Sequence, residues 1–154
     1  MKKKVFLEAH NIKNPYFGFG QFNDHLIRGL YNANIDDFKM VLHAKDIAKL
    51  KAEFGDYFEY KKYYSFRRYP IFGIRKKYDV WHSLNQNIKI EPQSKNSYVL
   101  TVHDVNFIEE VSNDLHHPRN LRFQEKLNRS AAITYISEYA KQSTHQHFKV
   151  PKVP

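Results

Sequence analysis

Short apolar segments alternate with stretches of helical periodicity along most of the chain. Six segments rich in β-forming residues predict strands, at residues 5–9, 38–42, 57–63, 79–82, 98–102 and 132–136. Between them, apolar or small residues recur at three- or four-residue spacing, which predicts helices at residues 22–30, 47–54, 118–131 and 140–148. Proline and glycine mark loops at residues 14–20 and 67–77.

This alternation predicts an α/β fold. Strands joined through helices pair in parallel, so we expect one mostly parallel sheet of about six strands with helices on both faces. The length of 154 residues suits a single domain. We expect that domain to cover residues 1–149, followed by a linker-like segment at residues 150–154 that contains two prolines.

Composition removes several classes of function. The chain has no cysteine, which excludes a disulfide scaffold, a thiolate zinc site and a cysteine nucleophile. No apolar run approaches the roughly 20 residues that span a bilayer. The first apolar run is too short for a signal peptide, so we expect a cytoplasmic location. A net charge of +9 points to acidic partners such as phosphates, nucleic acid or an anionic membrane.

Three features fall at the carboxyl ends of predicted strands, where open parallel sheets bind ligands. They are the loop with Gly18, Phe19 and Gly20, the segment from His82 to Asn85, and the pair His103-Asp104. Their convergence at one edge of the sheet is a stronger indication of a site than any one of them.

The glycine loop has two interpretations. Backbone amides exposed ahead of a helix suit a phosphate, because a Cβ at Gly18 or Gly20 would block close approach. The alternative is a plain turn between strand and helix. A dinucleotide fingerprint is incomplete, since Asn23 stands at its third glycine position, and no Gly-Lys-Ser/Thr of a P-loop occurs.

The polar residues at the other strand ends also have alternatives. His103 can hydrogen-bond a sugar hydroxyl or a phosphate, and Asp104 can accept a hydrogen bond from a hydroxyl. Equally, His103 can satisfy backbone groups at the strand end. Asn85 can bind a polar ligand or shape its loop, and for His82 we favour the loop-shaping role. The histidine pairs lack metal-site spacing, so we expect no metal.

The strongest charge signal is a basic aromatic segment, residues 57–78. It contains seven cationic residues and one acidic residue, Glu59, interleaved with nine aromatic residues. Such a segment can bind an anionic membrane surface or stack single-stranded nucleic acid. It can also be a solvated loop whose aromatic rings pack inward. The seven cations are Lys61, Lys62, Arg67, Arg68, Arg75, Lys76 and Lys77.

In their order and spacing, four segments resemble the amino-terminal domain of GT-B fold, retaining glycosyltransferases of family 4. They are Phe17-Gly18-Phe19-Gly20-Gln21-Phe22, Tyr78-Asp79-Val80-Trp81-His82-Ser83, Tyr98-Val99-Leu100-Thr101-Val102-His103-Asp104, and residues 132–141 continuing to residues 147–151. The resemblance covers nearly the whole chain. It departs from the family where Phe17 precedes Gly18, because family members often have adjacent glycines there.

The resemblance implies a Rossmann-like domain on the acceptor side of a cleft, in an enzyme that moves a sugar from a nucleotide-sugar to a glycan or lipid-linked acceptor with retention. It places His103 on the transferred sugar as the catalytic residue and the Gly18–Gly20 loop near the donor diphosphate. It assigns Asn85, Asp104 and Glu138 to acceptor or sugar binding. Family members usually need no metal cofactor, and many dock on membranes through a basic aromatic surface.

In this family a second domain binds the nucleotide-sugar and carries a Glu-x7-Glu signature. The chain ends near the expected start of the interdomain linker, so its own carboxyl-terminal domain is an expected partner. We expect the isolated domain to be inactive. The alternative from another class is a basic aromatic nucleic-acid-binding α/β module, although nucleic acid is not the partner we favour.

Overall fold

The protein is an α/β domain built on a parallel sheet. The computed structural model describes residues 2–93 and 97–154. Its six strands lie in the order β3-β2-β1-β4-β5-β6, and each of the five pairings is parallel. The strands are β1 (Lys3–Glu8), β2 (Phe38–Ala44), β3 (Glu59–Lys62), β4 (Val80–Ser83), β5 (Tyr98–Val102) and β6 (Ala132–Tyr135). The predicted sheet is confirmed.

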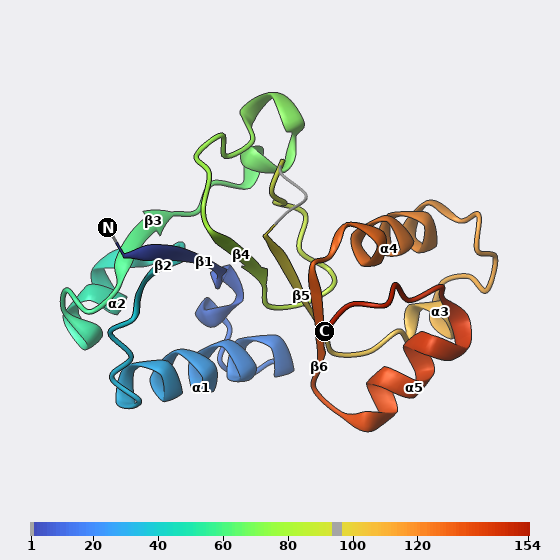
Figure 1. Ribbon diagram of the computed structural model, residues 1–154, viewed down its shortest axis with the longest axis horizontal. Helices are drawn as coiled ribbons and strands as arrows, with labels where there is room; N and C mark the ends of the chain where they lie inside the picture. Colours follow the sequence, from blue (N-terminus) through green and yellow to red (C-terminus); the bar gives the residue numbers. More distant parts are fainter. Residues whose placement is uncertain (1, 94–96) are drawn as a thin grey trace.

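Helices cover the sheet on both sides, which gives the three layers of a Rossmann-like fold (Figure 1). The α-helices are α1 (Gly18–Asn32), α2 (Ile47–Phe54), α3 (Phe107–Glu110), α4 (Pro118–Arg129) and α5 (Glu138–His147). Short 3-10 helices are η1 (His10–Lys13), η2 (Ser65–Arg68) and η3 (Pro70–Phe72).

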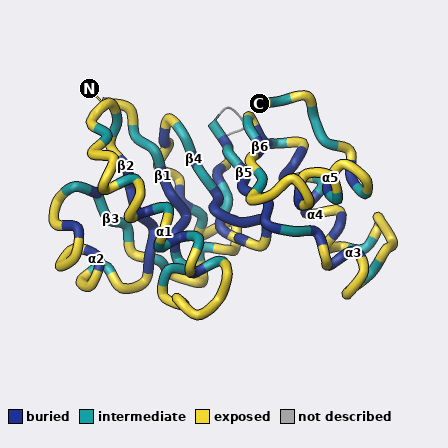
Figure 2. Tube along the Cα trace, turned by 90° about the horizontal axis from the view of Figure 1, so that it is seen from below, coloured by how far each residue is buried: buried dark blue, intermediate teal, exposed yellow. Residues whose placement is uncertain are grey.

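Alternation along the strands separates two cores. On β1, Phe6 points to the face covered by α3 and α4, where it packs with Val41 and Trp81. The next residue, Leu7, points to the opposite face with Leu42, under α1 and α2. Figure 2 shows the buried strands at the centre and the exposed residues along the outer turns.

Several boundaries differ from the sequence prediction, most of them by one or two residues, and three of the differences matter here. The helix α1 begins at Gly18, because Phe17 takes an extended conformation and serves as its N-cap. The helix α4 ends at Arg129, so Ala131 lies outside it and donates its amide to the Tyr98 carbonyl at 2.7 Å. The loop predicted at residues 67–77 contains η3 and part of η2.

The last residues lie against the outer strand β6. The Ile133 amide donates to the Pro154 carbonyl at 2.7 Å, and Val150 and Val153 pack against the core. Figure 1 shows the carboxyl terminus beside β6. The segment predicted to be linker-like therefore contacts the domain through Val150, Val153 and Pro154.

Candidate functional site

The amino-terminal end of α1 offers free backbone donors. The sequence predicted Gly18, Phe19 and Gly20 in a loop, and this is corrected: they form the first turn of α1. The Gln21 amide bonds the Phe17 carbonyl at 2.9 Å, whereas the three amides before it have no backbone acceptor among the described residues. This is also the positive end of the helix dipole, and it is suited to an anion.

The two glycines of this turn have different roles. A Cβ on Gly20 would lie 1.8 Å from the Asn14 carbonyl oxygen and 2.9 Å from the Asn11 carbonyl oxygen. Gly20 is therefore required for the close packing of α1 on η1. A Cβ on Gly18 would meet nothing within 4 Å, so only Gly18 leaves open space in front of the helix.

His103 directly follows β5 and is 8% exposed. Its Nε2 lies 2.8 Å from the Leu84 carbonyl oxygen, and its amide donates to Gln86 Oε1 at 3.0 Å. Because a carbonyl only accepts, Nε2 carries the proton and Nδ1 is left as the acceptor of the ring. Burial lowers the pKa of His103, and the Leu84 carbonyl and Asp104 oppose that shift without cancelling it.

The structure brings the α1 terminus, the segment after β4 and His103 together. The ring of Phe19 packs edge-on against the His103 ring, with 4.7 Å between the ring centroids. The ring of Phe22, one turn further along α1, packs in the same way at 4.7 Å. The Leu84 carbonyl bonds the imidazole Nε2, and Gln86 Oε1 accepts from the His103 backbone amide. The predicted convergence of three strand-end features on one place is thus present in the fold.

Asn85 and Asp104 both shape their own loops. The Asn85 side chain is 1% exposed, and its Oδ1 accepts from the Asn87 amide at 2.9 Å. Asp104 Oδ1 accepts from the Asn106 amide at 3.3 Å. Asp104 is half-buried beside His103 and can still contact a ligand, whereas the buried Asn85 supports the loop from behind.

Glu138 lies at the first turn of α5 and is exposed. Its hydrogen bond within the described part of the chain is with Gln142, at 3.4 Å. The adjacent Ser137 caps the helix by accepting from the Ala140 amide at 3.1 Å, as its place in the sequence predicted. No contact links Glu138 to His103 among the described residues.

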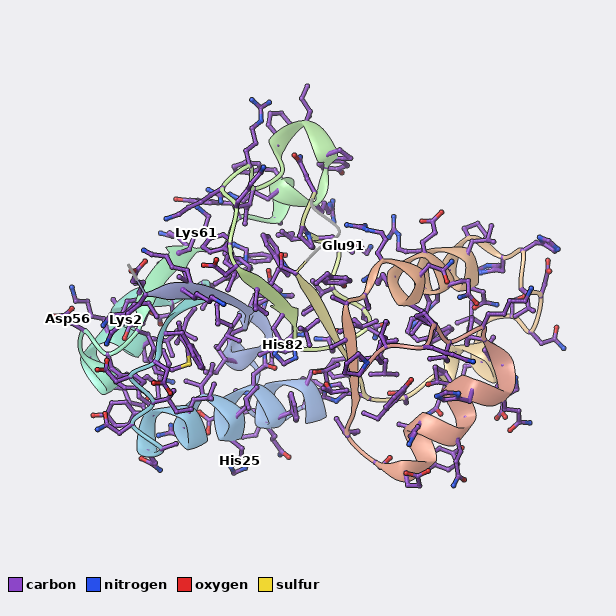
Figure 3. All side chains as sticks on the ribbon, viewed as in Figure 1. Lys2, His25, Asp56, Lys61, His82 and Glu91 are labelled. Atoms are coloured by element: carbon purple, nitrogen blue, oxygen red, sulfur yellow. The ribbon has the colours of Figure 1, made fainter. Side chains whose placement is uncertain are left out.

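His82 belongs to the sheet rather than to the site. Its Nε2 lies 2.8 Å from Thr101 Oγ1, which lies 2.8 Å from Thr134 Oγ1, so the three side chains form a polar row across β4, β5 and β6. Burial lowers the pKa of His82 to about 4. Figure 3 shows His82 in the middle of the molecule. The loop-shaping role favoured for His82 from the sequence is therefore corrected: the residue lies within β4 and its side chain contacts the neighbouring strand β5.

A buried polar cluster that sequence reasoning missed lies at the ends of β1 and β2. The Glu8 carboxylate is fully buried; it bonds His43 Nδ1 and lies 2.9 Å from His10 Nδ1. Burial alone would raise the pKa of Glu8, but the hydrogen bonds from His10 and His43 outweigh it and lower the pKa. The Tyr63 ring stacks on the His10 ring at 4.5 Å. The cluster fixes both histidine rings.

The basic aromatic segment begins around the edge strand β3, and its part with η2 and η3 projects from the sheet before the chain returns to β4 (Figure 1). The alternative interpretation, a loop with inward-packed rings, fits Phe58 and Tyr78 but not the tip. Lys61, in β3, is half-buried; burial and then the positive charges of Arg67 and Lys76 lower its pKa. The exposed apolar side chains of the tip are Tyr64, Phe66, Tyr69, Ile71 and Phe72, between 41% and 72% exposed.

The seven cations of this segment do not form one uniform patch. Arg75, Lys76 and Lys77 line a hollow of about 360 Å³ with Trp81. Arg67 and Arg68 line another hollow, of about 490 Å³, beside α4. Lys62 is exposed at the end of β3.

The described part of the chain also bears on metals and membranes. In residues 2–93 and 97–154, no cluster of three or more His, Asp or Glu side chains could hold a metal ion. Within the same residues, no helix is both long enough and apolar enough to cross a membrane.

Comparisons with protein-family models, curated proteins and solved structures found no match for this chain. We therefore infer its function from the residues and their geometry.

Proposed function

We propose that the protein is the acceptor-side domain of a retaining glycosyltransferase of the GT-B type. The observation that carries this proposal is the meeting of the α1 terminus with His103 at the carboxyl edge of the sheet. Phe19 contacts the His103 ring at 4.7 Å, so the free amides of α1 and the imidazole face one region. The sequence resemblance places the first of these elements near the donor diphosphate and His103 on the transferred sugar.

The two elements supply complementary chemistry. In sugar transfer the bond from the anomeric carbon to the donor diphosphate breaks, a bond to the acceptor oxygen forms, and the proton of the acceptor hydroxyl passes to the departing diphosphate. Negative charge grows on the departing diphosphate, and the amides and dipole of α1 stabilise it. His103 is neutral at physiological pH because burial lowers its pKa, so Nδ1 can accept a hydrogen bond from a sugar hydroxyl. Asp104 beside it can accept a second one.

The test is a transfer assay with the protein expressed from its complete reading frame, using a panel of nucleotide-sugars and lipid or glycan acceptors. We expect His103→Ala and His103→Gln to lose most transfer, while circular dichroism shows a folded protein. The matched control is His145→Ala, on the exposed face of α5. Wild-type turnover in a folded His103 variant would refute the assignment.

We further propose that the tip of the basic aromatic segment docks the enzyme on an anionic membrane. Exposed Ile71 and Phe72, at 72% and 55%, stand beside Arg67 and Arg68. Apolar side chains that enter the headgroup region, flanked by cations on anionic lipids, match this composition. Membrane docking would bring a lipid-linked acceptor close to the site.

Vesicle flotation tests the docking. Binding to vesicles with phosphatidylglycerol should fall at least tenfold in Ile71→Ser/Phe72→Ser, and neutral phosphatidylcholine vesicles should bind weakly. The control Lys141→Gln, on α5, should bind as wild type. If single-stranded RNA binds instead, with a steep dependence on log salt, the nucleic-acid alternative replaces the membrane proposal.

A further inference from the structure

A cationic cavity lies on the α4 side of the sheet, apart from the α1 terminus. It has a volume of about 540 Å³ and lies between the first three turns of α4 and residues 86–89, which follow β4. No Asp or Glu of the described chain lines it. The titratable groups that line it are Lys89, His117, Arg119, Arg122 and Lys126.

Most of this positive charge is not neutralised. Lys126 is 1% exposed; it donates to the Gln86 carbonyl at 2.9 Å and to the Ile88 carbonyl, and lies 3.4 Å from Glu91. By contrast, Lys89 and Arg122 are exposed and form no ion pair within residues 2–93 and 97–154.

Arg119 is held in a fixed position. Its guanidinium lies 4.7 Å from the centre of the Phe107 ring, and one of its nitrogens lies 3.4 Å from Asn87 Oδ1. Pro118 and Arg119 are the first residues of the twelve-residue α4, so the positive end of that helix adds to the field in the cavity.

Gln86 supplies an independent indication of a ligand. This side chain lines the cavity and is 4% exposed. Its Oε1 accepts from the His103 amide, but its Nε2 has no hydrogen-bond partner among the described residues. A buried donor without an acceptor is costly, and an anion at this wall would supply the acceptor. Gln86 also connects the cavity directly to His103.

We propose that this cavity binds the phosphate group of a phosphorylated substrate. Guanidinium forks and a lysine around a space without carboxylates favour phosphate, since arginine binds its oxygens in pairs. The cavity is larger than a phosphate, and Gln86, which lines it, hydrogen-bonds the His103 amide. It can therefore hold the phosphate of an ester whose other end reaches His103. If the proposed function is right, that ester is the acceptor.

Two sources could carry the phosphate, a soluble ester or a lipid headgroup. The hollow lined by Arg67 and Arg68 shares Lys89 and Arg122 with the cavity. This hollow is also lined by Arg129 and by two carboxylates, Glu91 and Glu125, so cations outnumber acids along it. It connects the cavity to the proposed membrane-docking tip, which makes a lipid phosphate sterically reachable. The shared chemistry is the phosphate, and the experiment separates the sources.

The experiment is titration calorimetry of the whole chain with inorganic diphosphate and with glycerol phosphate, at constant ionic strength. We expect saturable binding that Arg122→Gln and Lys89→Gln each weaken about tenfold, because each removes a charge-assisted contact. Lys141→Gln, an exposed lysine of α5, is the matched control for net charge and should bind as wild type. Circular dichroism of each variant checks the fold.

A second arm uses phosphatidylcholine vesicles with and without phosphatidic acid. A lipid source is assigned if Arg122→Gln weakens vesicle binding more than Lys141→Gln does, and a soluble source if only glycerol phosphate shows this difference. The proposal is overturned if inorganic diphosphate, glycerol phosphate and the phosphatidic acid vesicles all fail to bind saturably. It is also overturned if Lys141→Gln weakens binding as much as Arg122→Gln. Phosphate binding by this chain, together with no sugar transfer by the protein expressed from its complete reading frame, would instead remove the proposed function and leave the cavity assignment standing.

Discussion

Alanine substitutions at the three glycines of α1, Gly18, Gly20 and Gly29, can test separately whether the helix needs glycine for packing or for binding a ligand. In Gly20→Ala the new Cβ would lie 1.8 Å from the Asn14 carbonyl oxygen, where real Cβ atoms stay beyond 3.0 Å. Either α1 or η1 must move by about 1.2 Å, the difference between these two distances. The obstacle is backbone, and it is held by hydrogen bonds from Asn14 to Asn11 and from Phe17 to Asn14.

Overpacking of this kind costs about 1–3 kcal/mol, and the better helix propensity of alanine offsets up to about 1 kcal/mol. Because the obstacle is backbone, we take the upper end of that cost and expect Gly20→Ala to lose about 2 kcal/mol of unfolding free energy, or about 4–8 °C in Tm for a domain of this size. Gly29→Ala, whose Cβ meets nothing within 4 Å, should gain about 0.5–1 kcal/mol.

Thermal and urea unfolding followed by circular dichroism measure the series. Gly18→Ala, also open, should change stability by only a few tenths of a kcal/mol. The effect of Gly18→Ala on diphosphate binding, or on the rate of sugar transfer, then reports whether the amino-terminal end of α1 binds a ligand, because the fold is unchanged. A Gly20→Ala protein as stable as Gly29→Ala would refute the close packing of α1 on η1.

Three further outcomes are expected from buried polar groups. The pKa of His82 is about 4 in the folded protein and 6.5 for an unperturbed histidine, so the unfolded chain binds the proton first as the pH falls. The free energy of unfolding should therefore fall between about pH 6.5 and pH 4, by up to about 1.4 kcal/mol per pH unit. In urea titrations at several pH values, His82→Gln should flatten this slope. Lys126→Met leaves two buried carbonyls without their donor and should cost about 2 kcal/mol by urea unfolding; a loss below about 0.5 kcal/mol would contradict the contacts. Glu8→Gln removes the charge shared by His10 and His43 and should cost about 3 kcal/mol in the same assay, whereas an unchanged midpoint would show that the cluster contributes nothing.

Local patterns predicted the elements well. The strand at residues 98–102 and the helix at residues 47–54 have the predicted bounds, because an apolar run and a repeat of three to four residues each depend on neighbours in sequence. The helix α4 also begins at Pro118, as predicted from the preference of proline for the first turn.

Features that depend on distant residues were not predictable from one sequence. Glu8 and His43 are 35 positions apart, and their contact follows from the register of β1 and β2. The packing of Gly20 on Asn14 requires η1, which carries no periodic signal in four residues. The cationic cavity joins Lys89 to residues of α4, and a run of basic residues on a helix indicates only a solvated face until the opposing segment is placed.

The carboxyl-terminal segment affects how the sheet meets other molecules. The outermost strand of a sheet offers unpaired amides and carbonyls that can recruit a strand from another chain. Here the Pro154 carbonyl already occupies the Ile133 amide on the free side of β6. Pro151 and Pro154 have no amide hydrogen, so neither can donate to a further strand, and the Val153 amide already bonds the Pro151 carbonyl. The segment therefore covers part of this edge and lowers its tendency to pair with a strand of another chain.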